Sequence, residues 1–399
     1  MTFLKNFNAM MDSKFNPSAR QRRLFLPVST IIMIVLITVL ARFELINNYF
    51  QTIIVTICIN IIMSASLNIV NGYMGEFSCG HGGFMATGAY VSSVISLILF
   101  KDGNSITGSA LLPEGFALLG FPLAVIAGGL GAMLVSLIVA IPSFKTRDDY
   151  LAIITVAANF IVTTAINNIP AVGASRGLMG MKSVMNGMAD FIDVPWILIW
   201  GLVFAVLSIL SIYYLMNSTL GKGISAVKFD EISAEIMSVD TNRMKLIAFT
   251  FSSFLAGIAG GLFAHLLGFI NPSSFGIMKS TESLVMVYLG GMGSLSGSVL
   301  SAVIFTILLE LLRPAQIWKW VIIPLILILI MEFHPEGIMG SKELTDVFPF
   351  LKKLFPEDKN QKRPATGCGK NLKDGKNLKD DPVENSSETS NTTLSGGAK

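Results

Sequence analysis

Long apolar runs separated by short polar segments constrain the fold of this chain more than any other feature. A helix needs about 20 apolar residues to cross the hydrocarbon core of a bilayer. Strands of a membrane barrel are shorter and alternate strictly between apolar and polar residues, which these runs do not. The sequence therefore predicts an all-α, polytopic bundle of transmembrane helices. Its nine candidate spans are Leu24–Arg42, Phe50–Val70, Phe84–Phe100, Phe116–Ile141, Tyr150–Ile169, Trp196–Met216, Leu246–Ile270, Leu284–Leu312 and Ile317–Phe333.

The composition excludes an ordinary soluble protein and offers no catalytic constellation. The chain is 52% hydrophobic and 14% charged, whereas soluble domains carry about 25% charged residues. Its 3 cysteines and 3 histidines show no metal-ligand spacing. The sequence contains no Ser-His-Asp pattern, paired carboxylates or G-x-x-x-x-G-K-[ST] phosphate loop. We therefore expect no enzyme activity, metal, cofactor or nucleic-acid partner, and any ATP that drives this protein must bind to another chain.

Basic residues predict how the chain crosses the membrane. Cytoplasmic segments carry an excess of lysine and arginine, and the first run follows a stretch that contains Lys5, Lys14, Arg20, Arg22 and Arg23. Residues 1–23 are therefore expected in the cytoplasm, and counting spans places the polar loop 217–245 on the same side. The first run lacks a small-residue cleavage site, which indicates an anchor and not a removable signal peptide.

The parity of the spans depends on one interrupted run. Nine simple crossings would put the C-terminal tail outside, but Lys342, Lys352 and Lys353 follow the last run and favour the cytoplasm. Leu284–Leu312 is too long for one upright crossing and short for two, and GGMGSLSG interrupts it from Gly290 to Gly297. A broken or re-entrant helix there would resolve the parity. We therefore expect about nine to ten spans.

The transmembrane domain is expected to cover residues 24–340, and a polar tail follows at 341–399. From Lys359 onward the tail is rich in Lys, Asp, Asn, Ser, Thr and Gly, and it repeats GKNLKD. Such a segment has too little apolar surface to fold, so we expect it to be largely disordered. The sequence assigns it no function.

The polar loop between two of the runs has the pattern of a short surface helix. Gly221–Lys245 reads GKGISAVKFDEISAEIMSVDTNRMK and carries charges of both signs. On a helix, Phe229, Ile232, Ile236 and Val239 share one face. Such an amphipathic helix outside the membrane could dock in a groove of another protein. The alternative is an ordinary polar connection between two spans.

The wording of this loop resembles a known motif. EISAEIMSV, from Glu231 to Val239, is similar to the E-x-A-A-x-x-x-G coupling loop of ABC-importer permeases. Glu231 and Ala234 match that motif, while Ser233 stands where Ala is usual and Ser238 where Gly is usual. In that family the loop lies in a cleft of the cytoplasmic ATPase. The resemblance implies that coupling to an ATPase involves Phe229, Glu231, Ile232, Ser233, Ala234, Ile236 and Ser238.

A glycine-rich segment extends the resemblance. Asn71–Tyr90 reads NGYMGEFSCGHGGFMATGAY and resembles the N-terminal signature of branched-chain amino acid permeases. Such small residues let helix backbones touch or let the chain turn at membrane depth. Close helix packing and a role in the translocation path are therefore the two interpretations of this segment and of the later GGMG. They concern Gly75, Ser78, Gly80, His81, Gly82, Gly83, Gly88, Gly290, Gly291 and Gly293.

Further segments resemble the same family in the same order, over about residues 24–340. They are Thr146–Ala157, Asp230–Ala264, Asn271–Gly297 and His334–Gly340. Ser298 replaces a usual Pro, and the family's T-G-G-x-x-G is degraded to GASRGLMG at Gly173–Gly180. Motifs in the correct order and spacing are highly specific, so the chain resembles the M-type permease subunit of this family.

The resemblance implies a multi-pass protein of the bacterial cell membrane, surrounded by lipid. It also implies a second homologous permease subunit, two ABC ATPase subunits that hydrolyse ATP, and an extracytoplasmic amino-acid-binding protein. One alternative is a permease of the same architecture for urea or short amides, since the sequence does not name the cargo. A distant alternative is an ion-coupled secondary transporter, which needs paired intramembrane acids. Glu310 and Glu332 lie near span ends, and Glu76 is the one acid in a plausible midplane loop.

Overall fold

The structure is a computed structural model that describes residues 47–100, 116–144, 150–189 and 194–318. It also describes residue 38 and the positions 321–322, 325, 328, 332 and 337–340. The chain divides into the units Met1–Pro356 and Glu357–Lys399, and every described residue belongs to the first. All of the expected first span except residue 38 lies outside the described residues, as do the polar tail and most of the expected last span.

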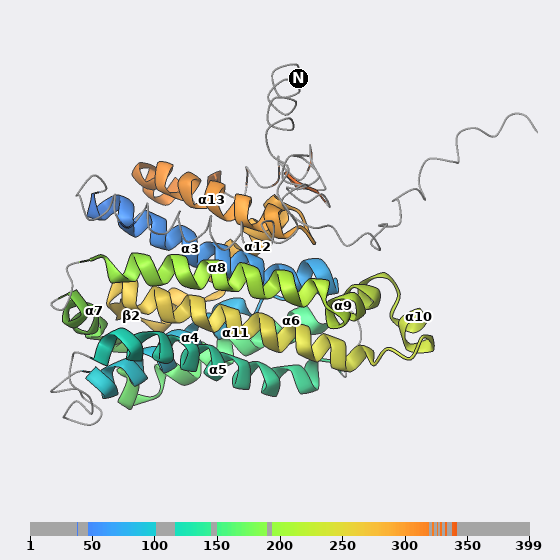
Figure 1. The fold of residues 1–399 in the computed structure, drawn as a ribbon, viewed down its shortest axis with the longest axis horizontal. Coiled ribbons are helices and arrows are strands. Elements are labelled where there is room, and N and C mark those ends of the chain that lie inside the picture. Colours follow the sequence, from blue (N-terminus) through green and yellow to red (C-terminus); the bar gives the residue numbers. More distant parts are fainter. Residues whose placement is uncertain are drawn as a thin grey trace, which may run out of the picture. The chain divides into compact units, whose positions relative to one another are not determined.

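Long apolar helices form the described unit (Figure 1). They are α3 (Asn48–Asn68), α4 (His81–Phe100), α5 (Ala117–Ser143), α6 (Tyr150–Asn167), α8 (Trp196–Asn217) and α11 (Thr241–Leu267). Within the described residues, 5 helices are long and apolar enough to cross a membrane, and a bent pair at α6 raises this to 6. This agrees with the predicted all-α membrane bundle. The expected total of nine to ten spans stays a prediction.

The bend follows α6. Leu151–Asn167 and Pro170–Arg176 meet at 84°, and the second arm consists of the 3-10 turns η3 (Pro170–Val172) and η4 (Ala174–Arg176). The degraded GASRGLMG segment begins in this arm and leads into β1 (Leu178–Met179) and α7 (Met181–Ala189). β1 pairs antiparallel with β2 (Phe269–Ile270), with Leu178 opposite Ile270. The turn η5 (Pro272–Phe275) follows β2.

The interruption expected between Gly290 and Gly297 is present. α12 (Ile277–Gly290) ends there and α13 (Leu295–Leu311) begins after it, followed by the turn η6 (Arg313–Trp318). Gly291 and Gly293 have φ angles of 106° and 86°, a region that side chains with a Cβ rarely adopt. Ile338 of the last predicted motif lies against the same break, because its backbone N donates to Leu289 O at 2.9 Å.

Asn68 at the end of α3 holds this break in place. Its Nδ2 donates to Ser294 O at 2.9 Å and to Ser298 Oγ at 2.8 Å. Its Oδ1 accepts from Gly293 N at 2.9 Å. The side chain thus gives Gly293 N an acceptor and Ser294 O a further donor, which helps to satisfy the backbone at a buried break.

The centre of the bundle is the packing of α4, α5 and α11, where small residues let the helices touch. A Cβ atom on Gly88 of α4 would lie 2.3 Å from Gly257 Cα of α11. One on Gly128 of α5 would lie 2.5 Å from Gly88 O. Backbones therefore meet directly, as small-residue motifs allow in membrane helices. Large side chains such as Phe84, Phe121 and Phe249 are buried around these contacts.

Candidate functional site

The predicted surface helix is two helices, and Asp230 separates them. α9 (Thr219–Phe229) ends at Asp230, and α10 (Glu231–Ile236) begins directly after it. Asp230 Oδ1 accepts from Ile232 N at 3.0 Å and from Ser233 N at 3.1 Å, while Oδ2 accepts from Ser233 Oγ at 2.6 Å. The hydroxyl bond from Ser233, followed by its backbone bond, lowers the pKa of Asp230. The single helix expected over Phe229–Val239 is therefore wrong, because an N-cap restarts the helix.

Large apolar side chains on these two short helices face outward. Phe229 is 80% exposed, Ile232 72%, Ile236 77% and Met237 78%. These four residues form the apolar patch of α9–α10. Ala234 beneath it is buried, and Val239, expected on the same face, is half-buried. Met237 was not predicted, although its place beside Ile236 could have indicated it. Several large apolar side chains exposed this close together in the chain indicate a candidate interaction site.

Ser238 ends α10 in the left-handed region with a φ angle of 63°. Ser238 N donates to Glu235 O at 2.9 Å, and Val239 N donates to Ala234 O at 3.0 Å. This is the pattern of a Schellman turn, whose left-handed position glycine usually occupies. The left-handed backbone at this position explains why glycine is usual in the similar motif, and Ser238 adopts the same turn at some cost in free energy.

Glu231, predicted as a contact to an ATPase, bonds to a lysine of its own chain. Lys245 Nζ on α11 lies 2.9 Å from Glu231 Oε2 and 2.8 Å from Glu76 Oε1. The Lys245 side chain is 12% exposed, that of Glu76 22% and that of Glu231 44%. Glu76 is therefore paired beside α10 in this structure. Sequence reasoning missed the pairing of Lys245 with Glu76 because 169 positions separate the two residues.

A second lysine joins α9 to the glycine-rich segment. After α3 the chain forms the π-helix η1 (Ile69–Met74), which ends at Gly75 with a φ angle of 82°. Lys228 Nζ donates to Gly72 O within this π-helix at 2.6 Å. Partial burial of the ammonium lowers the pKa of Lys228. Single π-turns in membrane helices are frequent at functional positions, and sequence reasoning did not select this lysine.

The rest of the glycine-rich segment lies inside the bundle. Gly75 is exposed, whereas the other predicted residues of this segment are buried: Ser78, Gly80, His81, Gly82, Gly83 and Gly88. Gly82 N donates to Ser280 Oγ at 2.8 Å, and Asn159 Nδ2 donates to the same oxygen at 2.9 Å. The start of α4 thus meets α6 and α12 at one buried polar junction. Among the later glycines, Gly290 and Gly291 are buried and Gly293 is half-buried.

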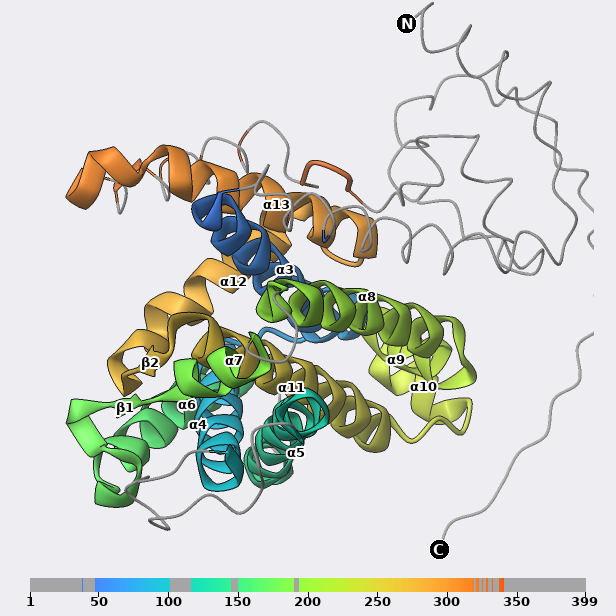
Figure 2. The same cartoon turned by 60° about the vertical axis from the view of Figure 1, so that its left-hand side comes forward.

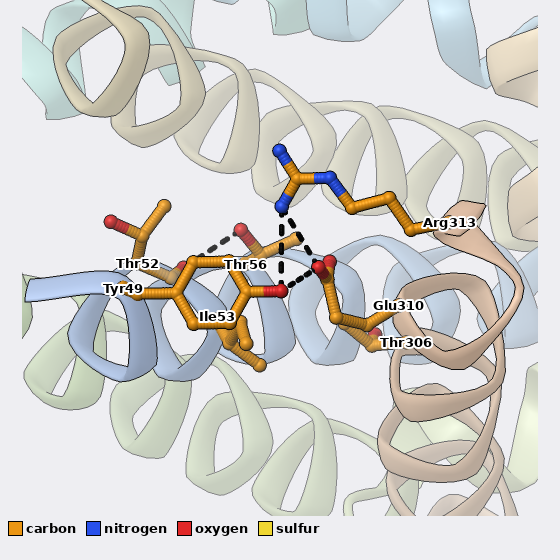
Figure 3. Close-up of a pocket in the computed structure, with 7 residues that line it drawn as sticks. All are labelled: Tyr49, Thr52, Ile53, Thr56, Thr306, Glu310 and Arg313. Carbon is orange, nitrogen blue, oxygen red and sulfur yellow. Dashed lines mark hydrogen bonds and ion pairs between the residues drawn. The ribbon is translucent and has the colours of Figure 1, made fainter. Parts of the chain in front are cut away.

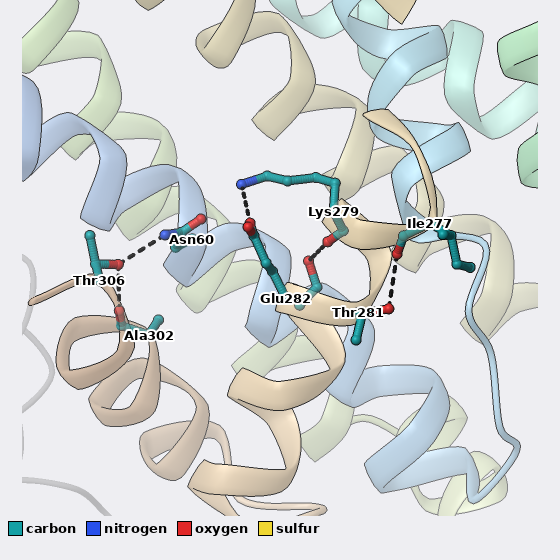
Figure 4. Close-up of polar contacts among 8 residues, drawn as sticks. Asn60, Ile277, Lys279, Thr281, Glu282, Ala302 and Thr306 are labelled. Atoms are coloured by element: carbon teal, nitrogen blue, oxygen red, sulfur yellow. Dashed lines mark hydrogen bonds and ion pairs between the residues drawn. The ribbon is translucent and has the colours of Figure 1, made fainter. Parts of the chain in front are cut away.

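An ion pair near this junction was not predicted (Figure 4). Lys279 Nζ and Glu282 Oε2 on α12 lie 2.8 Å apart, with side-chain exposures of 15% and 20%. The Lys279 ammonium also lies 5.5 Å from the ring centre of Phe263 on α11. The sequence does indicate this pair, because Lys279 and Glu282 are opposite charges three positions apart beside an apolar run, and charges inside a membrane bundle are usually paired.

A known protein family matches most of this chain. Residues 49–331 match the family described as the permease component of the branched-chain amino acid transport system. This chain belongs to that family.

Named relatives point in the same direction. The permease is 30% identical over 305 residues to the high-affinity branched-chain amino acid transport system permease protein LivM of Salmonella typhimurium, covering 70% of this chain and 68% of that protein. The LivM protein of Escherichia coli K12 gives the same values. The E. coli permease protein LivH is 25% identical over 303 residues, covering 72% and 92%. No solved structure matches the permease. The permease is thus a LivM-like multi-pass membrane protein.

The permease also has a pocket at the end of α3 that is far from η1 (Figure 3). Its volume is about 190 Å³, and its lining consists of Tyr49, Thr52, Ile53, Thr56, Thr306, Glu310 and Arg313. Arg313 Nη1 lies 2.9 Å from Glu310 Oε1, and the Tyr49 hydroxyl donates to the same carboxylate. Glu310 is therefore paired at the end of α13. Within the described residues, no group of three or more His, Cys, Asp or Glu could hold a metal ion.

Proposed function

We propose that this permease is the M-type subunit of an ATP-driven importer of branched-chain amino acids in the bacterial cell membrane. The observation that carries the proposal is the apolar patch of α9–α10, exposed on a family member that has no nucleotide-binding motif of its own. With the basic N-terminus in the cytoplasm, this patch lies on the cytoplasmic side. It docks on one of two ATPase subunits, while a second permease subunit completes the path and an extracytoplasmic binding protein delivers the amino acid.

The proposed mechanism is alternating access. ATP-driven closure of the ATPase pair displaces α10, and the attached helices open the path to the other side. α10 stays in its groove throughout, so the bistable part is the set of helices that connect to it. The path does not need to bind substrate tightly, because capture belongs to the binding protein and a deep energy well would slow release.

We also propose that the buried junction at the start of α4 belongs to the translocation path. Three polar atoms there, Ser78 Oγ, His81 Nδ1 and Asn159 Oδ1, are buried without a hydrogen-bond partner among the described residues. Buried polar atoms are rarely unpaired, because leaving them so costs about 1–3 kcal/mol each. Contact with water or substrate during the transport cycle would satisfy them. Gly80, Gly82 and Gly83 supply the space for close approach of the helices.

Replacing Ile232 by Asp is expected to release the ATPase from the assembled importer. Burying a large apolar side chain contributes about 1.5–3 kcal/mol, and the variant would instead bury an unpaired charge. We expect at least a tenfold weaker association, since about 1.4 kcal/mol corresponds to tenfold. The measurement is the amount of ATPase retained by tagged permease complex on a column, together with leucine uptake in proteoliposomes.

The matched control for this experiment is Ile232→Leu, which keeps an apolar side chain at the same position and should retain the ATPase. If Ile232→Asp retains the ATPase and its uptake equals that of the control, α9–α10 is only a polar connection. The cargo has a separate test. The binding protein that serves this permease should bind leucine, isoleucine or valine, and preferential binding of urea or short amides would overturn the cargo assignment alone.

A further inference from the structure

The apolar patch of α9–α10 is joined to the bundle by charged contacts as well as by the chain itself. Lys228, next to Phe229 of the patch, donates from Nζ to Gly72 O in η1. Its stem lies across the turn that ends η1, since a Cβ atom on Gly75 would be 2.9 Å from Lys228 Cγ. If the end of α9 moves, either its contacts with this turn break or the turn moves with it.

The second connection comes from α10. Glu231 is the first residue of α10, and Glu76 is the first residue after the turn at Gly75. Lys245 Nζ lies between their carboxylates, at 2.9 Å and 2.8 Å. We call Glu76, Lys245 and Glu231 the charged triad. It joins α10, α11 and the start of the non-helical segment that leads into α4, and Figure 2 shows α9 and α10 together at one end of α11.

The same turn contacts the broken helix on its other side. A Cβ atom on Gly72 would lie 2.4 Å from Gly293 N, within the break between α12 and α13. Asn68, one turn earlier, bonds directly to this break. One short segment, 68–76, therefore contacts the patch-bearing helices and the α12–α13 break, and the chain runs on from it through residues 77–80 into α4. π-turns in helices and breaks in membrane helices are frequent at functional sites.

These contacts fix the position of α9–α10 on the bundle. The Lys245–Glu231 pair, whose Glu231 side chain is 44% exposed, contributes little to folding and is screened by salt. Both lysines nevertheless hold α9–α10 in register with segment 68–76 through direct, charge-assisted bonds of 2.6–2.9 Å. A displacement of α10 would therefore act on segment 68–76 directly through these bonds, and not only through the longer path along the backbone.

We propose that Lys228 and the charged triad transmit movement of α10 to segment 68–76, and through it to the start of α4 and to the α12–α13 break. This inference rests on the proposed function, because α10 moves only if an ATPase docks on it. The four side chains are positioning residues, which act through the backbone that they hold. Glu231 thereby acquires a role toward its own chain in addition to the predicted contact with the ATPase.

The test uses the complete importer in proteoliposomes and measures leucine uptake per ATP hydrolysed, with ATPase retention measured separately. Lys245→Met removes both arms of the triad, and Lys228→Met removes the bond to Gly72. The matched control is Lys222→Met, because Lys222 is an exposed lysine on the same helix α9. We expect Lys245→Met and Lys228→Met to keep the ATPase but lower uptake per ATP at least fivefold, while Lys222→Met stays at the wild-type value.

A charge-inverted variant guards against a merely structural effect. Combining Glu76→Lys, Lys245→Glu and Glu231→Lys restores attraction with the opposite polarity and should recover at least half of the wild-type uptake per ATP. Normal uptake per ATP in Lys245→Met and Lys228→Met overturns the inference and leaves ATPase docking intact. Failure of the inverted variant to recover, although it assembles, overturns it as well. If Ile232→Asp also retains the ATPase, the proposed function fails, and that result is distinct from the other two.

Discussion

Gly88→Ala and Gly260→Ala are expected to prevent most of the permease from reaching a stable fold, whereas Gly201→Ala is expected to be tolerated. A Cβ atom on Gly88 would lie 2.3 Å from Gly257 Cα, and one on Gly260 would lie 2.0 Å from Met85 O. Both obstacles are backbone atoms, so α4 and α11 would have to separate. Overpacking usually costs about 1–3 kcal/mol, and we place these variants at the upper end or above it.

Gly201 is the matched control because it is a buried glycine inside another candidate span, α8. A Cβ atom there would meet Val55 Cγ1 at 3.4 Å, an ordinary contact. Alanine gains about 1 kcal/mol of helix propensity over glycine at all three positions, so propensity cannot explain a loss at only two. The measurement is the Tm and the monodisperse fraction of the isolated permease in detergent. Equal Tm values for the three variants would contradict the close-contact explanation. The contact partners belong to this chain, so the defect requires no second subunit.

Removing one partner of the Lys279–Glu282 pair is expected to destabilise the permease strongly, whereas removing both is not. Each single variant, Lys279→Met or Glu282→Leu, leaves a charge unpaired among candidate spans, at side-chain exposures of 15% and 20%. Breaking a fully buried pair costs about 3–5 kcal/mol, and we place this half-buried pair near the lower end of that range, while apolar replacement of both partners is often neutral or stabilising. We therefore expect a lower Tm in both single variants and a near-normal Tm in the double variant.

A second pair at the same helical spacing provides the control. Glu310 and Arg313 are also three positions apart, but the Arg313 side chain is 67% exposed. Exposed pairs contribute about 0–1 kcal/mol, so Arg313→Met should lower the Tm much less than Lys279→Met. Additive effects in the Lys279–Glu282 cycle would show that the two charges do not depend on each other, contrary to this expectation.

The sequence alone was sufficient for the features that depend on local composition. Runs such as Trp196–Met216 and Leu246–Ile270 predicted α8 and the greater part of α11, because the length and hydropathy of a span are properties of one contiguous segment. The interruption at GGMG was visible for the same reason, since only glycine readily adopts the angles of Gly291 and Gly293. The restart of the helix at Asp230 also has a local signal, because an aspartate is a favoured N-cap, although the apolar spacing of Phe229, Ile232 and Ile236 favours one continuous helix.

Features that join distant segments were decided only by the tertiary structure. The sequence offered Glu231 and Lys245 as charges in one polar loop, but not Glu76 as the third member of their triad. The sequence shows that residues 88 and 257 are glycines, but it does not show that they contact each other. Tertiary packing decides which helices contact each other. Where two helices touch, a glycine in place of a larger residue, or the pairing of two charges, allows the close contact. The sequence of each segment therefore predicts that it spans the membrane, whereas the contacts between α10 and the bundle depend on how the segments pack.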